Sequence, residues 1–187
     1  SSDTSATCSH PVARLHADIP VGSPTIRGGA SWNINKKASN LIIETTPTGK
    51  PYLKDYPTHF FNISHTDSLI LIALAKNPVG IDVEKIERNA DKEAILKHFF
   101  SEKEQQSYFS QPENQRQLAF FKGWTRKESI LKATGEGLSA MKKYEVSFEP
   151  VTDYPLLNKE EYNSFKISDF TPNDGYAACL ALFTTSC

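Results

Sequence analysis

The sequence predicts an α+β fold, in which strands come first, three helices follow and strands return towards the end of the chain. Three observations support this class. Short runs rich in β-branched and aromatic residues occupy residues 41–84. Helical spacing replaces them over residues 90–133, and strand-like alternation returns between residues 144 and 183. With 187 residues, 39% of them hydrophobic, the chain can form one domain or two small lobes with a shared core.

The part of the chain before residue 85 predicts an arm followed by strands. Residues 1–31 are rich in Ser, Thr, Pro, Gly and Ala and have almost no periodic apolar pattern. We therefore expect a tail or extended arm there, with disorder as an open alternative. Gly and Pro mark a loop at residues 46–51. Strands are expected at residues 41–43, 59–63, 69–75 and 79–84.

Helices are expected in the middle of the chain. The spacing of Ile95, Leu96 and Phe99 predicts a helix over residues 90–99. Ser101 and Glu104 form a capping-box pattern, in which both side chains bond amides at the start of the next helix. A third helix is expected from about residue 114 to residue 133, with a glycine at 135 as its stop. The closing strands are expected at residues 144–149, 162–168 and 176–183.

Composition argues against several classes of protein. A net charge of -1 provides no general attraction to nucleic acid or to an anionic membrane, so any anion must meet a local basic patch. The longest apolar run, residues 69–75, is far too short to cross a bilayer, and residues 1–10 lack the features of a secretory signal. Cys8, Cys179 and Cys187 are odd in number and widely spaced, which argues against a disulfide framework or a zinc site. We expect a monomeric, cytoplasmic protein.

Two acidic side chains lie two positions apart on the strand expected at residues 79–84. Because side chains alternate along a strand, Asp82 and Glu84 share one face, while Ile81 and Val83 point to the other and can anchor the strand in the core. Such a pair at a strand end is more often a solvated edge than a site. Alone, the pattern therefore leaves both interpretations open.

A second charged pair lies on the third expected helix. Glu128 and Lys132 are four residues apart and so share a helix face, and Trp124 precedes Glu128 by one turn. The common interpretation is a surface ion pair that contributes little. An apolar surround at Glu128 favours a functional role instead.

Two further motifs are weak when each is taken alone. Gly49, Lys50 and Pro51 lie in a loop where glycine allows a close backbone approach and lysine can meet a phosphate, although a plain turn is the simpler explanation. Ser64 and His65 follow a strand, where the histidine can donate to a phosphate or cap the strand.

Taken in this order, the motifs resemble the 4'-phosphopantetheinyl transferases, specifically the larger, surfactin-synthetase-activating type. The similarity covers about residues 33–183. The motifs that support it are G-K-P at 49–51, F-N-I-S-H at 61–65, G-I-D-V-E at 80–84, F-F-S-E-K-E at 99–104, W-T-R-K-E-S at 124–129, Lys132 and G-E-G-L at 135–138. The resemblance implies two similar α+β lobes about a pseudo-two-fold axis, with coenzyme A between them. We accordingly expect an arm at 1–31, a shortened first lobe at 32–76, and a second lobe at 77–187 that carries a metal site.

The activity that the resemblance implies is transfer of the 4'-phosphopantetheine arm of coenzyme A to a serine of an acyl or peptidyl carrier protein. Adenosine 3',5'-bisphosphate leaves. Mg²⁺, with Mn²⁺ as an alternative, fits the carboxylates of Asp82, Glu84 and Glu128. Glu128, directly or through water, is the candidate base, and Lys132 neutralises phosphate charge. The residues expected to bind coenzyme A are Gly49, Lys50, Pro51, Ser64, His65, Asp82 and Lys132.

Carrier proteins of this kind tend to be acidic, so the resemblance also implies a basic docking surface with an apolar centre. The candidates lie just after the acidic strand: Lys85, Ile86, Arg88, Lys97, Phe99 and Phe100. The family usually has an N-terminal helix whose arginine reaches coenzyme A, and residues 1–31 do not resemble it. Arg27, Lys36 and Lys37 are possible substitutes, and nothing in the sequence chooses among them.

Two alternative functions stay open. One is another Mg²⁺-dependent phosphoester enzyme, such as a hydrolase, that uses the same three carboxylates without a carrier. The other is a non-catalytic module that binds coenzyme A or carrier proteins. The joint presence of Asp82, Glu84, Glu128 and Lys132 favours an enzyme over the module.

Overall fold

The structure is a computed structural model, and it describes residues 14–18, 34, 40–66, 69–87, 91–148, 154–155 and 165–184. Its strands are β1 (Arg14–Asp18), β2 (Ile43–Thr45), β3 (Pro51–Leu53), β4 (Phe60–Thr66), β5 (Leu69–Ala75), β6 (Val79–Lys85), β7 (Tyr154–Pro155), β8 (Phe165–Phe170) and β9 (Tyr176–Phe183). Its helices are α1 (Lys92–Phe99), α2 (Glu102–Ser110), α3 (Glu113–Thr134) and the 3₁₀ helix η2 (Leu138–Lys143). Strands, helices and strands follow one another, which confirms the α+β class.

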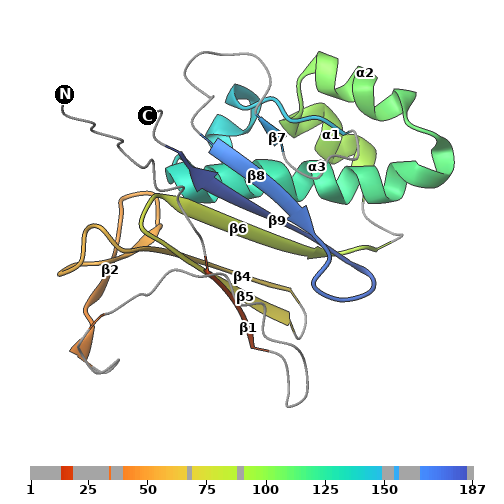
Figure 1. The fold of residues 1–187 in the computed structure, drawn as a ribbon. Helices are drawn as coiled ribbons and strands as arrows, with labels where there is room; N and C mark the ends of the chain where they lie inside the picture. Colours follow the sequence, from red (N-terminus) through yellow and green to blue (C-terminus); the bar gives the residue numbers. More distant parts are fainter. Residues whose placement is uncertain are drawn as a thin grey trace, which may run out of the picture.

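The described strands form three antiparallel sheets. Their orders are β1-β5-β4, β2-β3 and β6-β9-β8-β7. Figure 1 shows the helices on one side of the sheet that contains β6, β9 and β8, and the sheet of β1, β5 and β4 on the other side. On β5, residues 69, 71, 73 and 75 are buried, and they pack with Val79, Ile81 and Val83 of β6 in one core cluster. This packing brings the two larger sheets together and confirms that Ile81 and Val83 anchor β6.

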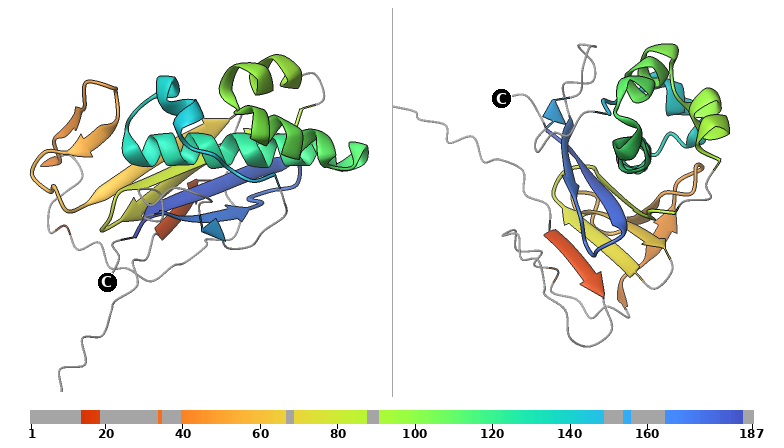
Figure 2. Two further views of the ribbon diagram at one scale, coloured as in Figure 1. Left: turned by 90° about the horizontal axis from the view of Figure 1, so that it is seen from above. Right: turned by 90° about the vertical axis from the view of Figure 1, so that its right-hand side faces the viewer.

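Helix α3 lies against β6 and β9, as the view from above in Figure 2 shows. The approach is close because Gly80 has no side chain. A Cβ atom at this position would lie 1.9 Å from the carbonyl oxygen of Ser129 and 2.4 Å from the amide nitrogen of Ala133. The glycine therefore sets the distance between the acidic strand and the helix that carries Glu128 and Lys132.

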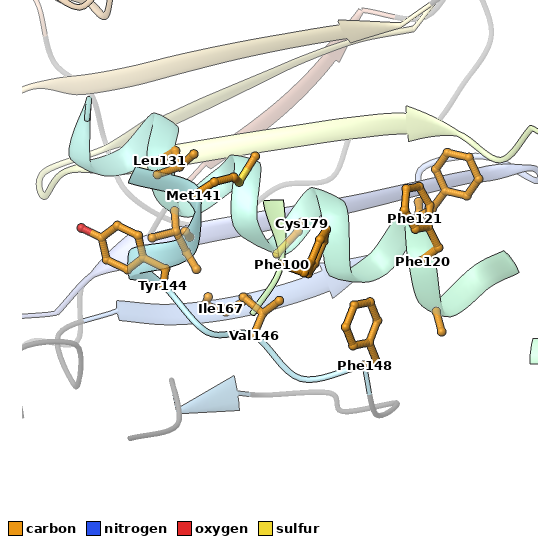
Figure 3. Close-up of a cluster of buried hydrophobic side chains, with 14 of the residues drawn as sticks. Phe100, Phe120, Phe121, Leu131, Met141, Tyr144, Val146, Phe148, Ile167 and Cys179 are labelled. Atoms are coloured by element: carbon orange, nitrogen blue, oxygen red, sulfur yellow. The ribbon is translucent and has the colours of Figure 1, made fainter. Parts of the chain in front are cut away.

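A second core cluster packs on α3 and also includes residues of β8 and β9. Aromatic rings form a large part of it, and Figure 3 shows Phe100, Phe120, Phe148 and Tyr144 among its members. Phe100 and Phe148 lie 5.4 Å apart between ring centroids, within the range of favourable aromatic pairs. This cluster anchors α3 in the core, while Glu128 and Lys132 of the same helix line a cleft.

The three expected helices are confirmed, although α1 begins at Lys92, two residues later than predicted. Ser101 and Glu104 form the capping box of α2, in which each side chain accepts a hydrogen bond from the backbone N–H of the other residue. Helix α3 ends at Thr134, and Gly135 caps it. The positive φ of Gly135, 77°, supplies the left-handed turn that glycine adopts without strain. None of the helices in the described ranges has the length and apolar character needed to span a membrane.

The strand expected at residues 144–149 is wrong over the residues that the structure describes, 144–148. Tyr144, Val146 and Phe148 are buried in alternation, but their segment packs on α3 instead of joining a sheet. Its backbone groups bond to side chains: the Val146 N–H donates to Glu104 at 2.8 Å, and the Tyr144 carbonyl accepts from Lys127 at 2.8 Å. Alternating burial therefore arose without a strand ladder.

Other strands differ in position. β1 lies within the expected arm, where the sequence has no clear strand pattern, and it pairs with β5. β3 and β7 were also not expected, β2 begins two residues later than predicted, and β8 extends to Phe170. The rest of residues 1–31 lies outside the described residues, so the tail or arm stays a prediction there.

Candidate active site

Asp82 is the most buried acid of the predicted site. It lies on β6 with 3% of its surface exposed. Its Oδ1 accepts a hydrogen bond from Lys132 Nζ at 2.6 Å and another from Ser64 Oγ at 3.0 Å. None of the described residues gives Oδ2, which is also buried, a hydrogen bond. Because buried polar atoms are almost always satisfied, this oxygen indicates a missing partner.

Glu84 lies on the same face of β6, as the alternation predicts. The indole N–H of Trp124 donates to its Oε1 at 3.3 Å. Burial raises the pKa of Glu84 to about 7, and the neighbouring charges of Asp82 and, more weakly, Glu128 add to this effect. Glu84 is therefore hard to ionise mainly because it is buried, and the two neighbouring carboxylates make it harder still.

Glu128 faces the same acids from α3. Burial raises its pKa, the charge of Asp82 raises it further, and Lys132 opposes the shift. Lys132 also forms an ion pair with Asp82 on β6, with 2.6 Å between Nζ and Oδ1. The two residues are distant in the sequence. Three acids and one cation from β6 and α3 therefore act on one another electrostatically.

These groups line one cleft of about 310 Å³. Its lining residues are Ile63, Ser64, His65, Asp82, Val83, Glu84, Trp124, Glu128 and Lys132. A neighbouring cleft of about 280 Å³ shares Ile63, Glu128 and Lys132 with it. The remaining residues of this second cleft are Thr48, Gly49, Lys50, Pro51, Asn62, Leu131, Gly135, Gly137 and Leu138. Every residue predicted for the site thus lies at one of two adjoining clefts.

Lys50 reaches this region in an unexpected way. Its ammonium group donates to the carbonyl oxygen of Ala133 in the last turn of α3, where a cation also meets the negative end of the helix dipole. Burial lowers the pKa of Lys50 to about 8. Gly49, with a φ of 88°, turns the loop that carries it. A phosphate contact of Lys50 therefore stays a prediction, as do the roles of Gly49, Pro51 and the exposed His65.

The three carboxylates are oxygen ligands of the kind that a divalent cation prefers. Their present arrangement does not yet form a coordination site. Within the described ranges, no three His, Cys, Asp or Glu side chains form a group that could hold a metal ion. Lys132 occupies Oδ1 of Asp82, and Trp124 holds Glu84. Oδ2 of Asp82 nonetheless has no hydrogen-bond partner among the described residues, and the charge of Asp82 adds to the burial that raises the pKa values of Glu84 and Glu128. A hard cation with oxygen ligands would satisfy that atom and relieve the repulsion between these carboxylates.

The expected docking surface is only partly accessible. Phe100 is fully buried, so its place at an apolar docking centre is wrong; it packs in the aromatic core behind α3. Ile86 and Phe99 are partly buried against the same core, whereas Lys85 and Lys97 are exposed. Arg88, Arg27, Lys36 and Lys37 lie outside the described residues.

Sequence reasoning missed Asn62 and the donor role of Trp124. Asn62 is buried, and its Oδ1 accepts the backbone N–H of Ile81 at 2.8 Å. A polar residue within the apolar strand pattern of residues 60–63 was the available signal. It also missed Lys127, which is fully buried and bonds Glu104 at 2.9 Å, because a lysine between two site residues looks like a surface residue.

Sequence comparisons relate the chain to known proteins. Residues 78–181 match the model of the 4'-phosphopantetheinyl transferase superfamily. The chain is 33% identical to "4'-phosphopantetheinyl transferase HetI" of Nostoc sp., over 72% of this chain and 57% of that protein. It is 40% identical to "4'-phosphopantetheinyl transferase psf-1" of Bacillus pumilus, over 53% of this chain and 42% of that protein. It is 32% identical to "4'-phosphopantetheinyl transferase Sfp" of Bacillus subtilis, over 64% and 52%. The chain spans about half the length of these curated relatives.

Proposed function

Because the chain belongs to the 4'-phosphopantetheinyl transferase superfamily, we propose that it transfers the 4'-phosphopantetheine arm of coenzyme A to a serine of an acyl or peptidyl carrier protein. The serine oxygen bonds to the phosphorus that carries the pantetheine. The bond from that phosphorus to the bridging oxygen of the diphosphate breaks, and adenosine 3',5'-bisphosphate leaves with the electron pair. The serine proton passes to a base of the protein.

The observation that carries this proposal is the convergence of Asp82, Glu84, Glu128 and Lys132 on one cleft. Phosphoryl transfer depends mainly on positioning and on neutralising the charge of the phosphate oxygens. An ammonium group beside three carboxylates supplies a fixed cation and a set of oxygen ligands in the same place. A surface edge or a helical ion pair, the simpler interpretations of each motif, does not require this convergence.

Each residue has a distinct part in the proposed reaction. Lys132 neutralises a phosphate oxygen as charge moves to the leaving group. Glu128 is the candidate base, and its raised pKa gives it a greater affinity for the serine proton than an ordinary carboxylate has. Asp82, Glu84 and Glu128 would hold Mg²⁺ or Mn²⁺, which when bound supplies further charge neutralisation at the diphosphate.

Coenzyme A would occupy the second cleft, whose lining includes Gly49, Pro51 and Lys132. Lys50 and His65 would hold its nucleotide phosphates, and Ser64 would shape the pocket from the first cleft. The monomeric state, the cytoplasmic location and the absence of nucleic-acid or membrane partners stay predictions.

The test is intact-mass analysis of an apo-carrier protein incubated with coenzyme A, Mg²⁺ and this protein. We expect the carrier to gain the mass of one phosphopantetheine arm, with one adenosine bisphosphate released for each carrier modified. Glu128→Gln keeps the shape of the side chain and removes its charge, so it should abolish the gain while the circular dichroism spectrum stays unchanged. Cleavage of coenzyme A without a carrier would instead indicate a hydrolase, and coenzyme A binding without turnover on a panel of carriers would indicate a binding module.

A further inference from the structure

Two edge strands from different sheets meet beside the candidate active site. β4 ends the sheet β1-β5-β4, and β6 ends the sheet β6-β9-β8-β7. An edge strand presents backbone amides that need partners when they are buried. On β6, the N–H of Ile81 donates to Asn62 Oδ1 at 2.8 Å, and the N–H of Val83 donates to Ser64 Oγ at 3.2 Å. Side chains of β4 therefore satisfy these amides of β6.

The spacing of these two bonds matters for Asp82. Asn62 and Ser64 are two positions apart on β4, and the amides that they bind lie on either side of Asp82 in the sequence. The backbone of Asp82 is thus held from both sides. Both side chains are themselves buried, so water does not compete freely for the same bonds.

The Ser64 hydroxyl also holds the carboxylate itself. It donates to Asp82 Oδ1 at 3.0 Å while accepting from the Val83 N–H and from Lys132 Nζ, the latter at 3.1 Å. A hydroxyl group has one donor and two acceptor sites, so all of them are used and its orientation is fixed. Oδ2 is the Asp82 oxygen that receives no hydrogen bond from the part of the chain that the structure describes.

We propose that Asn62 and Ser64 are positioning residues, which join β6 to β4 and thereby aim the Asp82 carboxylate into the active-site cleft. Their kinetic effect rests on the proposed transferase function, but the structural join does not. They act through Asp82: Asn62 by fixing its backbone, and Ser64 by fixing both its backbone and its Oδ1.

Hydrogen exchange measured by NMR tests the join directly on the protein without coenzyme A. Asn62→Ala should raise the exchange rate of the Ile81 amide by about tenfold or more relative to the amides of β8 and β9, because a buried N–H loses its acceptor. Ser64→Ala should do the same at Val83, and Ser64→Thr, which keeps a hydroxyl, should restore protection. If Asn62→Ala does not fold, Ser64→Ala removes a single oxygen and carries the same test.

Asn77→Ala is the matched control. Asn77 also uses its side-chain amide to bond a backbone group, the Phe183 carbonyl at 3.0 Å, but it lines neither active-site cleft. We expect it to leave the Ile81 and Val83 amides protected. In the transfer assay, Asn62→Ala and Ser64→Ala should lower kcat, whereas Asn77→Ala should keep both kcat and the KM for coenzyme A.

The outcomes separate the two proposals. Selective loss of protection at Ile81 and Val83, with a lowered kcat that Ser64→Thr restores, supports the inference. Wild-type exchange at both amides overturns it. An equal loss of protection at these amides in Asn77→Ala also overturns it. If the wild-type protein transfers nothing yet the selective loss is seen, the proposed function fails while the join between β4 and β6 stands.

Discussion

Asp82 is the residue that connects the two halves of the candidate site. Its Oδ1 binds the ammonium group of Lys132 and the hydroxyl group of Ser64, while no described residue bonds its buried Oδ2. Local spacing predicted that Lys132 and Glu128 share a helix face. It could not predict that Lys132 forms its ion pair with Asp82, because that contact depends on how α3 packs on β6.

Lys132→Ala should lower the rate of carrier modification on the order of a hundredfold or more, as removal of one transition-state donor typically does. Steady-state kinetics with saturating coenzyme A measure this effect. Lys122→Ala, a change on the same helix outside both active-site clefts, is the control and should keep the wild-type rate. An unchanged rate in Lys132→Ala would reduce the contact with Asp82 to a structural ion pair.

Glu84 predicts a pH dependence of stability. Its pKa is about 7 in the folded protein, above its ordinary value of 4.5, so the folded state binds the proton more tightly than the unfolded state. Without divalent cations, this group's contribution to stability therefore falls as pH rises from about 4.5 to 7. Glu84→Gln cannot ionise and should melt a few degrees above the wild type at pH 8, with the difference vanishing near pH 4.

Thermal denaturation followed by circular dichroism at several pH values measures this difference in Tm. Glu87→Gln, a change at an exposed carboxylate of the same segment, is the control. The same difference in Tm at pH 4 and pH 8 would contradict the raised pKa of Glu84, which we assign first to burial and then to the charges of Asp82 and Glu128.

At the scale of elements, sequence pattern predicted the helices well because their signals are local. The capping box of α2 and the glycine after α3 lie within a few residues of the boundaries that they set. Residues 144–148 could not be assigned in this way. Their alternation is real, but Glu104 and Lys127, distant in the sequence, bind their backbone in place of a neighbouring strand.

The contact between α3 and β6 gives a prediction at the same scale. Gly80→Ala places a methyl group against the backbone of α3, so it should destabilise the fold by about 1–3 kcal/mol or more. It should also lower activity per folded molecule, because a shift of about 1 Å between reacting groups can cost on the order of a hundredfold. Denaturant unfolding and kinetics on the folded fraction measure the two effects.

Gly123→Ala is the matched control for this change. Its added methyl group would meet the Phe148 ring at 2.4 Å, on α3 but within the aromatic core and not at β6. We expect lower stability with nearly normal activity of the folded protein. Equal losses of activity in the two variants would show that the distance between α3 and β6 has no special role in the site.

At the scale of the whole molecule, the chain changes sheets between β5 and β6. The strands up to β5 form the first two sheets, and those from β6 onwards form the third. The assignment of residues 32–76 and 77–187 to two lobes stays a prediction. The order of motifs indicated the family. The bond from the Ile81 N–H to Asn62 and the bond from Lys50 to the Ala133 carbonyl join distant segments, so no local pattern reveals them.

We propose that Asp82, Glu84 and Glu128 together hold one divalent cation beside Lys132, and the proposed function depends most on this site. Electron paramagnetic resonance of Mn²⁺, titrated into the protein with coenzyme A present, tests this most directly. We expect one bound Mn²⁺ for each chain in the wild type, and strongly weakened binding in Asp82→Asn and Glu128→Gln. Equal Mn²⁺ binding by the wild type and both variants, or no binding by the wild type, would contradict the account.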